Sequence, residues 1–313
     1  MLQDILFQKI EAYDTIIIHR HERPDGDALG SQIGLALALK TRYPNKNIYC
    51  VGDASRRYGF IGYMDLIEDS KYSGALAIIV DVAVANMVSD QRYRLASEVF
   101  VIDHHKNDCD ITPNFIQDTT RIAAAELVAA MLYERGFEIS KECATALYLG
   151  VVTDSGRFLY GFSKNTFEIA SKLSESGADA KYIYDNIYVE TKEEREMKNY
   201  FQNKINYIGK VAYMKNDYSV FEKFNVEFQD ISRGMVNLMA GISDVEIWAN
   251  FTYDKEKDKV ICEFRSRSIP IVDVAKKWGG GGHSLACGCT INDFKEADLV
   301  LNDFLELIKI SEN

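Results

Sequence analysis

The sequence has too few basic residues for a protein that coats long nucleic acid. Lys and Arg total 36 against 47 Asp and Glu, which gives a formal net charge of −11. Tight binding to a long strand neutralises many phosphates with Lys and Arg, so this excess of acid argues against it. A short ligand with few phosphates stays compatible with the composition if bound cations supply the positive charge.

Cysteine is also scarce, and long apolar runs are missing. The six cysteines are scattered without a CxxC pair, which predicts reduced, packed thiols in a cytoplasmic protein; Cys287 and Cys289 leave a metal-binding pair as an alternative. The start, Met1-Leu2-Gln3-Asp4, lacks the basic residues of a signal peptide. No run reaches the ~18 apolar residues of a membrane span, so we expect no membrane contact.

A length of 313 residues and a hydrophobic content of 47% indicate about two globular domains. Apolar runs at 15–18, 75–80 and 99–102 alternate with helical segments, a pattern typical of an α/β domain with a doubly wound, mostly parallel sheet. We expect this domain over residues 1–190, a helical linker over 191–215 and a smaller α/β domain over 216–313.

Potential metal ligands follow these apolar runs. The segment His21-Glu22-Arg23-Pro24-Asp25-Gly26-Asp27 leaves the first predicted strand and enters a helix, and Asp81 and Asp103-His104-His105 follow two further strands. Ligands bind at the carboxyl ends of strands in open α/β sheets. Four of the five histidines lie in these loops or in a glycine-rich loop near the C-terminus, which favours a common site over scattered core histidines.

Together these segments and the end of a later helix supply six oxygen and nitrogen donors: His21, Asp25, Asp27, Asp81, His104 and Asp154. Six donors without a thiolate are too many for one tetrahedral zinc ion. They suit two octahedral ions such as Mn²⁺ or Mg²⁺, spaced ~3.5–4 Å, which activate water and stabilise a phosphoryl transition state. The alternative for the first loop is a solvated acidic turn that caps a helix.

The two adjacent histidines cannot take equivalent positions. One of His104 and His105 would bind metal, and the other would face the substrate as an acid or phosphate donor. Asp103 either orients one of these rings or caps the turn. His19, inside the first strand, is expected to be a packed residue near the site.

A second cluster lies near the C-terminus, where Arg265-Ser266-Arg267 precedes Gly279-Gly280-Gly281-Gly282-His283. Glycines let backbone N–H groups approach an anion, and Arg offers a forked contact to phosphate. A glycine run alone is more often a flexible loop, so the argument depends on the metal ligands elsewhere in the chain.

These residues resemble a known family. The histidine–aspartate loop, Asp81, Asp103-His104-His105 and Thr153-Asp154-Ser155-Gly156-Arg157-Phe158 resemble the four motifs of the DHH phosphoesterase superfamily. The Arg265 and Gly279–Gly288 segments resemble its associated C-terminal domain. Cys287 departs from this pattern, in which a small residue such as Ala or Ser is usual.

The resemblance implies two Mn²⁺ ions, with Mg²⁺ or Co²⁺ as possible substitutes. One ion would be held by His21, Asp25 and Asp81, and the other by Asp27, Asp81, His104 and Asp154. Catalysis would depend on Asp81 and on His105 beside the scissile phosphate. Substrate would lie in a cleft between the domains, and the residues binding it would be Arg265, Ser266, Gly281, Gly282 and His283.

Within the superfamily the chain looks most like bacterial nanoRNases that are also pAp phosphatases. This implies a phosphodiesterase that uses a metal-bridging hydroxide to cleave nanoRNA or pApA- and pGpG-type dinucleotides to mononucleotides. A homodimer and a link to cyclic di-AMP signalling are further expectations. The alternatives are a cyclic-dinucleotide phosphodiesterase, a manganese inorganic pyrophosphatase, a RecJ-like exonuclease and a non-catalytic nucleotide sensor. The glycine loop argues against the pyrophosphatase, the acidic charge against the exonuclease, and the full ligand set against the sensor.

The predicted role of His283 gives a first test. The His283→Ala variant is expected to raise KM for a short substrate with little change in kcat, because a substrate-holding contact is lost. Steady-state kinetics measure both constants, and an unchanged KM would contradict the role.

Overall fold

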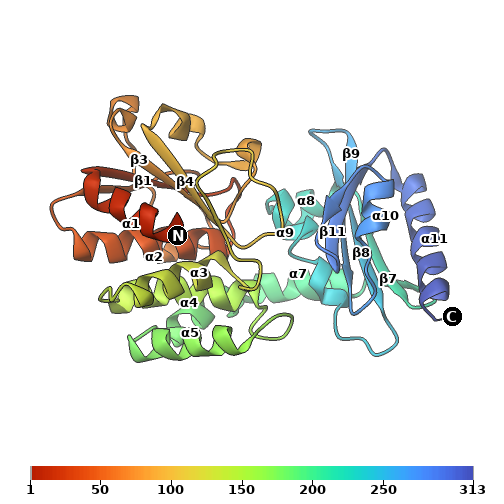
Figure 1. Ribbon diagram of the computed structural model, residues 1–313. Helices are drawn as coiled ribbons and strands as arrows, with labels where there is room; N and C mark the ends of the chain where they lie inside the picture. Colours follow the sequence, from red (N-terminus) through yellow and green to blue (C-terminus); the bar gives the residue numbers. More distant parts are fainter. Residues whose placement is uncertain (1, 313) are drawn as a thin grey trace. The chain divides into compact units, whose positions relative to one another are not determined.

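The computed structural model describes residues 2–312, which form two compact units divided between residues 189 and 190. The first unit contains a five-stranded parallel sheet in the order β2-β1-β3-β4-β5 (Figure 1). Its strands are β1 (Thr15–His19), β2 (Asn47–Cys50), β3 (Leu76–Val80), β4 (Glu98–Asp103) and β5 (Phe115–Gln117). All five residues of β3 are buried, which explains why the strand is apolar throughout.

The two faces of this sheet are covered differently. One face packs against α1 (Leu2–Ala12), α2 (Gly26–Arg42), α3 (Ala124–Glu134) and α4 (Lys141–Asp154). Helices α5 (Lys164–Glu175) and α6 (Ala180–Ile187) contact α4. The predicted α/β class is therefore confirmed, and the parallel strand order β2-β1-β3-β4-β5 is a common order of doubly wound sheets; the second face is covered in another way.

Short 3₁₀ turns cover that second face. Two tyrosines from these turns are buried: Tyr72 from the turn Asp69–Tyr72 and Tyr93 from the turn Gln91–Leu95. They pack against apolar side chains of the sheet, which include Ile17 and Ile79. Two further 3₁₀ turns lie at Gly59–Ile61 and Ala85–Met87. Large tyrosine rings from these turns cover apolar surface of the sheet, so this face is buried by turns.

Helices α2 and α4 approach each other closely because glycines line their contact. A Cβ atom on Gly30 would lie 2.4 Å from the Ala146 carbonyl oxygen. A Cβ atom on Gly150 would lie 2.7 Å from an oxygen of Asp27. The side chains of Asp27 on α2 and Asp154 on α4 can reach a common point only because the helix axes are this close.

The second unit contains a six-stranded mixed sheet in the order β10-β11-β9-β8-β7-β6, in which only the β7–β8 pair is parallel. Its strands are β6 (Asn206–Ile208), β7 (Val211–Asn216), β8 (Ile247–Asp254), β9 (Lys259–Ser266), β10 (Gly281–Gly282) and β11 (Ala286–Ile291). The expectation of a second α/β domain is confirmed.

Helices cover both faces of this second sheet (Figure 1). One face packs on α10 (Val272–Lys277) and α11 (Phe294–Ser311). The other face packs on α7 (Lys192–Gln202), α8 (Ser219–Phe224), α9 (Phe228–Ser232) and the 3₁₀ turn Val236–Met239. Burial alternates along β9, where successive side chains point to opposite faces: those on the face packed against α10 and α11 are buried, and those on the other face are half-buried at this strand.

The predicted helical linker at 191–215 is wrong. This segment contains α7, β6 and most of β7, and β7 is hydrogen-bonded within the second sheet. The charged run around Glu193 and Glu194 concealed a helix whose other side buries Met197 and Phe201 in the core of the second unit.

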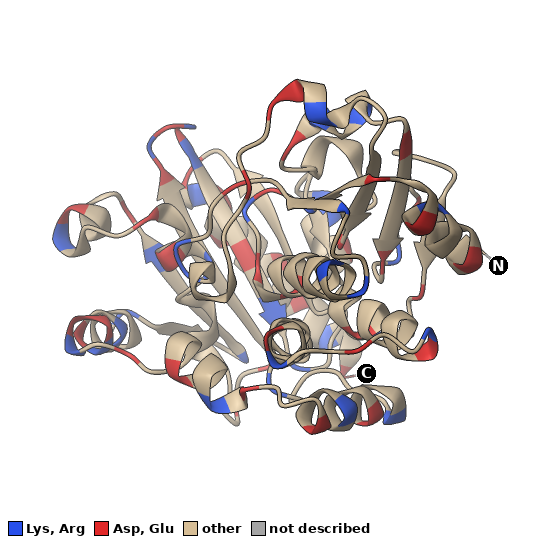
Figure 2. Ribbon diagram, turned by 90° about the vertical axis from the view of Figure 1, so that its left-hand side faces the viewer, with Lys and Arg blue, Asp and Glu red and all other residues tan. Residues whose placement is uncertain are grey.

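Acidic and basic residues are both scattered over the elements in Figure 2, and the basic residues form no continuous stripe in that view. Among the helices at residues 2–312, none is both long enough and apolar enough to traverse a bilayer.

The Gly30→Ala variant tests the α2–α4 contact. Alanine favours helices over glycine by about 1 kcal/mol, but its Cβ would press on a backbone oxygen that cannot move alone. We expect a net loss of about 1–2 kcal/mol in the free energy of unfolding, measured by urea denaturation. Gly59→Ala is the matched control, since no atom lies within 4 Å of its Cβ position. Equal stability of Gly30→Ala and the parent would contradict the close packing.

Candidate metal centre and active site

The N-terminus of α2 positions the first two aspartates. Asp25 is the N-cap residue, and its Oδ1 accepts hydrogen bonds from the backbone N–H groups of Asp27 and Ala28, at 3.1 and 3.0 Å. The alternative prediction, an acidic turn that caps a helix, therefore describes Asp25 correctly. It does not exclude a metal site, because the carboxylate also faces the Nε2 atom of His21 at 3.7 Å.

Asp27 is fully buried and serves a second helix. Its two oxygens accept hydrogen bonds from the backbone N–H groups of Ala124 and Ala125 at the start of α3, at 2.6 and 2.8 Å. The N-cap residue of α3, Ala123, has no side chain that could do this. The carboxylate is thus fixed in place by the helix that it caps.

Asp81 follows β3 and connects the two sides of the site. Its backbone is left-handed, with φ of +59°, and its N–H group donates to the Ile102 carbonyl at 2.9 Å. Its Oδ2 atom lies 3.4 Å from Nε2 of His21, and its Oδ1 atom lies 3.6 Å from Nε2 of His104. A left-handed non-glycine residue is costly, and such strain is concentrated at functional sites.

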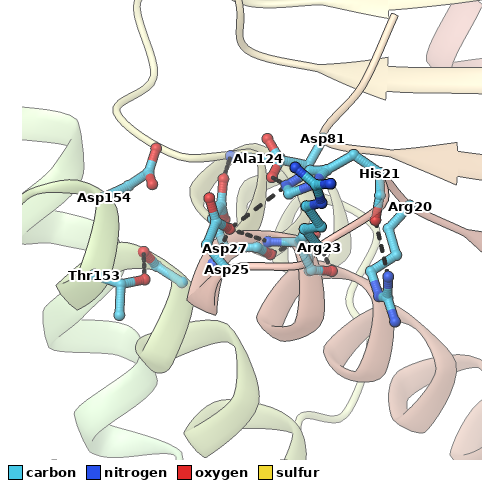
Figure 3. Close-up of polar contacts among 12 residues, drawn as sticks. Arg20, His21, Arg23, Asp25, Asp27, Asp81, Ala124, Thr153 and Asp154 are labelled. Carbon is cyan, nitrogen blue, oxygen red and sulfur yellow. Dashed lines mark hydrogen bonds and ion pairs between the residues drawn. The ribbon is translucent and has the colours of Figure 1, made fainter. Parts of the chain in front are cut away.

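His104 gathers the remaining carboxylates. Its Nε2 atom lies 3.7 Å from Oδ2 of Asp27 and 3.4 Å from Oδ2 of Asp154, the last residue of α4. Figure 3 shows Asp25, Asp27 and Asp81 converging from α2 and the end of β3, with Asp154 reaching toward them from α4. All six predicted donors therefore lie within one cluster.

Backbone carbonyls orient both histidine rings. The Nδ1 atom of His21 lies 2.6 Å from the Glu22 oxygen, and that of His104 lies 3.3 Å from the Arg121 oxygen. A carbonyl only accepts, so each Nδ1 carries the proton and each Nε2 is left to face the carboxylates. Neutral imidazoles that bind metals are held in this way.

The cluster is electrostatically unfavourable without cations. Burial, then repulsion by Asp81 and Asp154, raises the pKa of Asp27 well above its usual value. Burial, then repulsion by Asp25 and Asp81, does the same to the pKa of Asp154. Burial opposes the charged form of His21, but hydrogen bonds with Asp25 and Asp81 outweigh it and raise its pKa to about 11.

The donor set fits divalent cations. Oδ1 of Asp81 and Nε2 of His104 are buried and make no hydrogen bond within the described residues, an arrangement that is costly unless something else binds them. Two separate groups of donors, His21–Asp25–Asp81 and Asp27–His104–Asp154, could each hold an ion, and Asp81 of the first also lies near His104 of the second. A third group, Asp81–Asp103–His104–His105, shares Asp81 with the first and His104 with the second. Oxygen and nitrogen donors of this kind suit ions such as Mg²⁺ and Mn²⁺.

Asp103 orients His105, one of the two roles considered for it. Its Oδ1 atom accepts from the Nδ1 and the backbone N–H of His105, at 2.8 and 3.2 Å. Burial opposes the charged ring, but the bond to Asp103 and the charge of Asp81 raise the pKa of His105 to about 9. His104 and His105 thus have different surroundings, as adjacent residues at a strand end must.

Sequence reasoning missed Arg20. This arginine is fully buried, and its guanidinium donates to the carbonyl oxygens of His21, at 2.8 Å, and Asp53. An arginine next to a strand end gives no signal of such a role. His19 is buried between Tyr72 and Tyr93, with ring centroids 5.7 and 6.1 Å away, as expected of a packed residue.

The predicted substrate-binding residues lie together in the second unit. Arg265 and Ser266 end β9, and the two glycines of β10 pair with Cys287 and Gly288 of β11. Ser266 Oγ accepts from the backbone N–H of Ile269 at 3.0 Å. The remaining predicted residue, His283, opens the turn from β10 to β11. Cys287 and Cys289 are buried in the core, and no metal-ligating group within residues 2–312 includes a cysteine.

The chain matches two family models. Residues 15–151 match the N-terminal domain of the DHH family, and residues 215–310 match the DHHA1 domain. The chain belongs to the DHH family. The predicted superfamily, and with it the predicted phosphoesterase class, is confirmed. Asp154 lies beyond the first matched range, so it is the geometry that joins it to the other donors.

Similar proteins cover nearly the whole chain. A Bacillus subtilis protein named bifunctional oligoribonuclease and PAP phosphatase NrnA is 34% identical, over 98% of this chain and 99% of its own. A Mycoplasma pneumoniae protein with the same name is 34% identical, over 96% of this chain and 95% of its own. The crystal structure of an exopolyphosphatase-related protein from Bacteroides fragilis has a TM-score of 0.86 at 25% identity, over 97% and 95% of the two chains.

Because the pKa of Asp154 is raised, we expect its charge to lower the stability of the protein while it contributes to metal binding. Asp154→Asn removes a repelled charge and keeps the shape of the side chain, so the Tm of chelated protein should rise by about 2–4 °C. The rise in Tm on adding Mn²⁺ should shrink at the same time. Differential scanning fluorimetry measures both, and Asp108→Asn, at an exposed loop position, is the control. A lower Tm of the chelated variant would contradict the proposed repulsion.

Proposed function

We propose that this chain is a Mn²⁺-dependent phosphodiesterase that cleaves very short oligonucleotides to mononucleotides and also removes a phosphate from pAp. Support comes from the donor cluster together with relatives named bifunctional oligoribonuclease and PAP phosphatase, which are similar over nearly their full length. The acidic net charge suits a short ligand better than a long strand.

The position of Asp81 carries this proposal. Its two oxygens face different histidines, His21 and His104, so the carboxylate suits a bridge between two ions. His21, Asp25 and Asp81 would hold one ion, and Asp27, Asp81, His104 and Asp154 the other. When bound, the ions supply positive charge that activates water and offsets the charge developing on the phosphate.

The chain's own residues orient the substrate and move protons. His105 is held through Nδ1 by Asp103, and its raised pKa keeps Nε2 protonated at neutral pH as a donor to a phosphate oxygen. We assign the binding of the substrate's phosphates to Arg265, Ser266, Gly281, Gly282 and His283. In this assignment the first unit does the chemistry and the second holds the substrate.

Several finer assignments belong to the same proposal. Mn²⁺ is taken as the working metal, with Mg²⁺ or Co²⁺ as substitutes, and pApA or pGpG as dinucleotide substrates, linking the enzyme to cyclic di-AMP signalling. A homodimer in the cytoplasm is the predicted setting. Analytical ultracentrifugation and cell fractionation test these last two predictions.

Asp81→Asn tests the assignment more cleanly than an alanine variant would. Asparagine tolerates the left-handed backbone at this position and keeps the side chain's shape, but it lacks the charge that two ions would share. We expect kcat on pApA to fall at least about 10³-fold while the far-ultraviolet circular dichroism stays unchanged.

The substrate range is measured with Mn²⁺ and a panel of pAp, pApA, cyclic di-AMP, a five-nucleotide RNA, a long single strand and pyrophosphate. Cleavage of pApA or the short RNA, with little on the long strand, is the expected result. Activity on pyrophosphate alone, or nucleotide binding without any turnover, would overturn the proposal. So would substantial turnover by folded Asp81→Asn protein.

A further inference from the structure

Two arginines of the second unit share one carboxylate. Arg233, which follows α9, donates from Nε to Oε1 of Glu263 at 3.1 Å. Arg265, near the end of β9, donates from Nη1 to the other oxygen, Oε2, at 3.3 Å. Glu263 therefore holds a guanidinium on each side, and the group of three has a net charge of +1.

Buried amides fix the segment that carries Arg233. The side-chain NH₂ group of Asn250 on β8 donates to the carbonyl oxygens of Ile231 and Ser232, both at 2.8 Å. Asn250 in turn accepts from the side-chain amide of Asn216 on β7 at 2.7 Å, and both asparagines are fully buried. The end of α9 is thus tied to the centre of the sheet, one residue before Arg233.

Both guanidiniums keep donors for another partner. Arg265 uses Nη1 for Glu263 and for the Phe264 carbonyl, at 2.8 Å. Within residues 2–312, Nε and Nη2 of Arg265 and both terminal nitrogens of Arg233 make no hydrogen bond. The Arg265 side chain is only 23% exposed, so its unused donors are partly desolvated and suited to a charged acceptor.

On its β11–β10 side, the sheet beside this pair carries almost no side chains. Glu263 is in register with Gly288 of β11, which is in register with Gly281 of β10. The neighbouring row places Ala286 next to Arg265. The Cβ position of Gly281 has no atom within 4 Å, so the surface ends in open space. A flat floor of small residues bordered by two guanidiniums suits a phosphate with an attached sugar or base.

We infer that Arg233 is a second phosphate-binding residue, paired with Arg265 through Glu263, and that the pair receives the terminal phosphate of a short oligonucleotide. This inference rests on the proposed function, since it concerns the same substrate. Glu263 is a positioning residue: it sets the direction of both guanidiniums, whose planar forks must match the oxygens of one phosphate. Neither Arg233 nor Glu263 belongs to the sequence motifs discussed above.

Arg233→Ala tests the inference with pApA and with ApA, which lacks the terminal phosphate. We expect KM for pApA to rise about tenfold with kcat within twofold, KM for ApA to stay unchanged, and Arg233→Lys to restore part of the loss. Calorimetric titration of pApA into chelated protein provides a readout without turnover, in which Kd should rise by a similar factor. Lys257→Ala, in the exposed turn between β8 and β9, is the matched control for the lost charge.

Glu263→Gln separates positioning from simple charge. Removing a negative charge beside a phosphate site would by itself lower KM, whereas the loss of the shared carboxylate is expected to raise KM for pApA severalfold. A lowered KM would overturn the positioning role, and an equal rise for ApA and pApA in Arg233→Ala would overturn terminal-phosphate binding. If the parent protein cleaves neither substrate, the proposed function fails, while the calorimetric comparison still decides the role of Arg233.

Discussion

The crowding of carboxylates at one edge of the parallel sheet is the constraint on which the first unit depends. Asp27, Asp81 and Asp154 come from three different elements and face the same histidine, His104. Their burial and mutual repulsion oppose folding, so the surrounding structure has to hold them in place. It does so with a helix start bonded to Asp27 and a left-handed turn at Asp81. The strain is concentrated where cations would relieve it.

Much of this site could be predicted because of how parallel sheets are built. Their carboxyl ends meet at one edge, so polar residues directly after apolar runs, such as Asp81 and His104, had to be neighbours. The second function of Asp27 could not be predicted, since the helix that it caps begins far along the chain. Arg20 was missed for a similar reason: its partners are backbone oxygens, which leave no mark in a sequence.

The fold was harder to predict where the exposed side chains of an element were taken to represent the whole element. The charged surface of α7 suggested a linker, but its buried residues pack in the core of the second unit. Tyrosines from short 3₁₀ turns cover one face of the first sheet, and turns this short leave no periodic pattern in a sequence. In the second unit the sequence showed the Arg265 motif. Only the three-dimensional structure shows that the carboxylate of Glu263 joins Arg265 to Arg233. Local sequence patterns do not show which distant segments of the chain contact one another.

The glycine-lined contact between α2 and α4 has a consequence for how the protein is made. Glycines such as Gly30 weaken the intrinsic helical preference of α2, which therefore depends on a partner more than a hundred residues away. During synthesis the ribosome must release α4, and with it Asp154, before α2 finds that partner. The nascent chain thus carries an incomplete cluster for most of the translation of this unit. Contacts of such long sequence separation form slowly, so this pairing is a natural late step in folding.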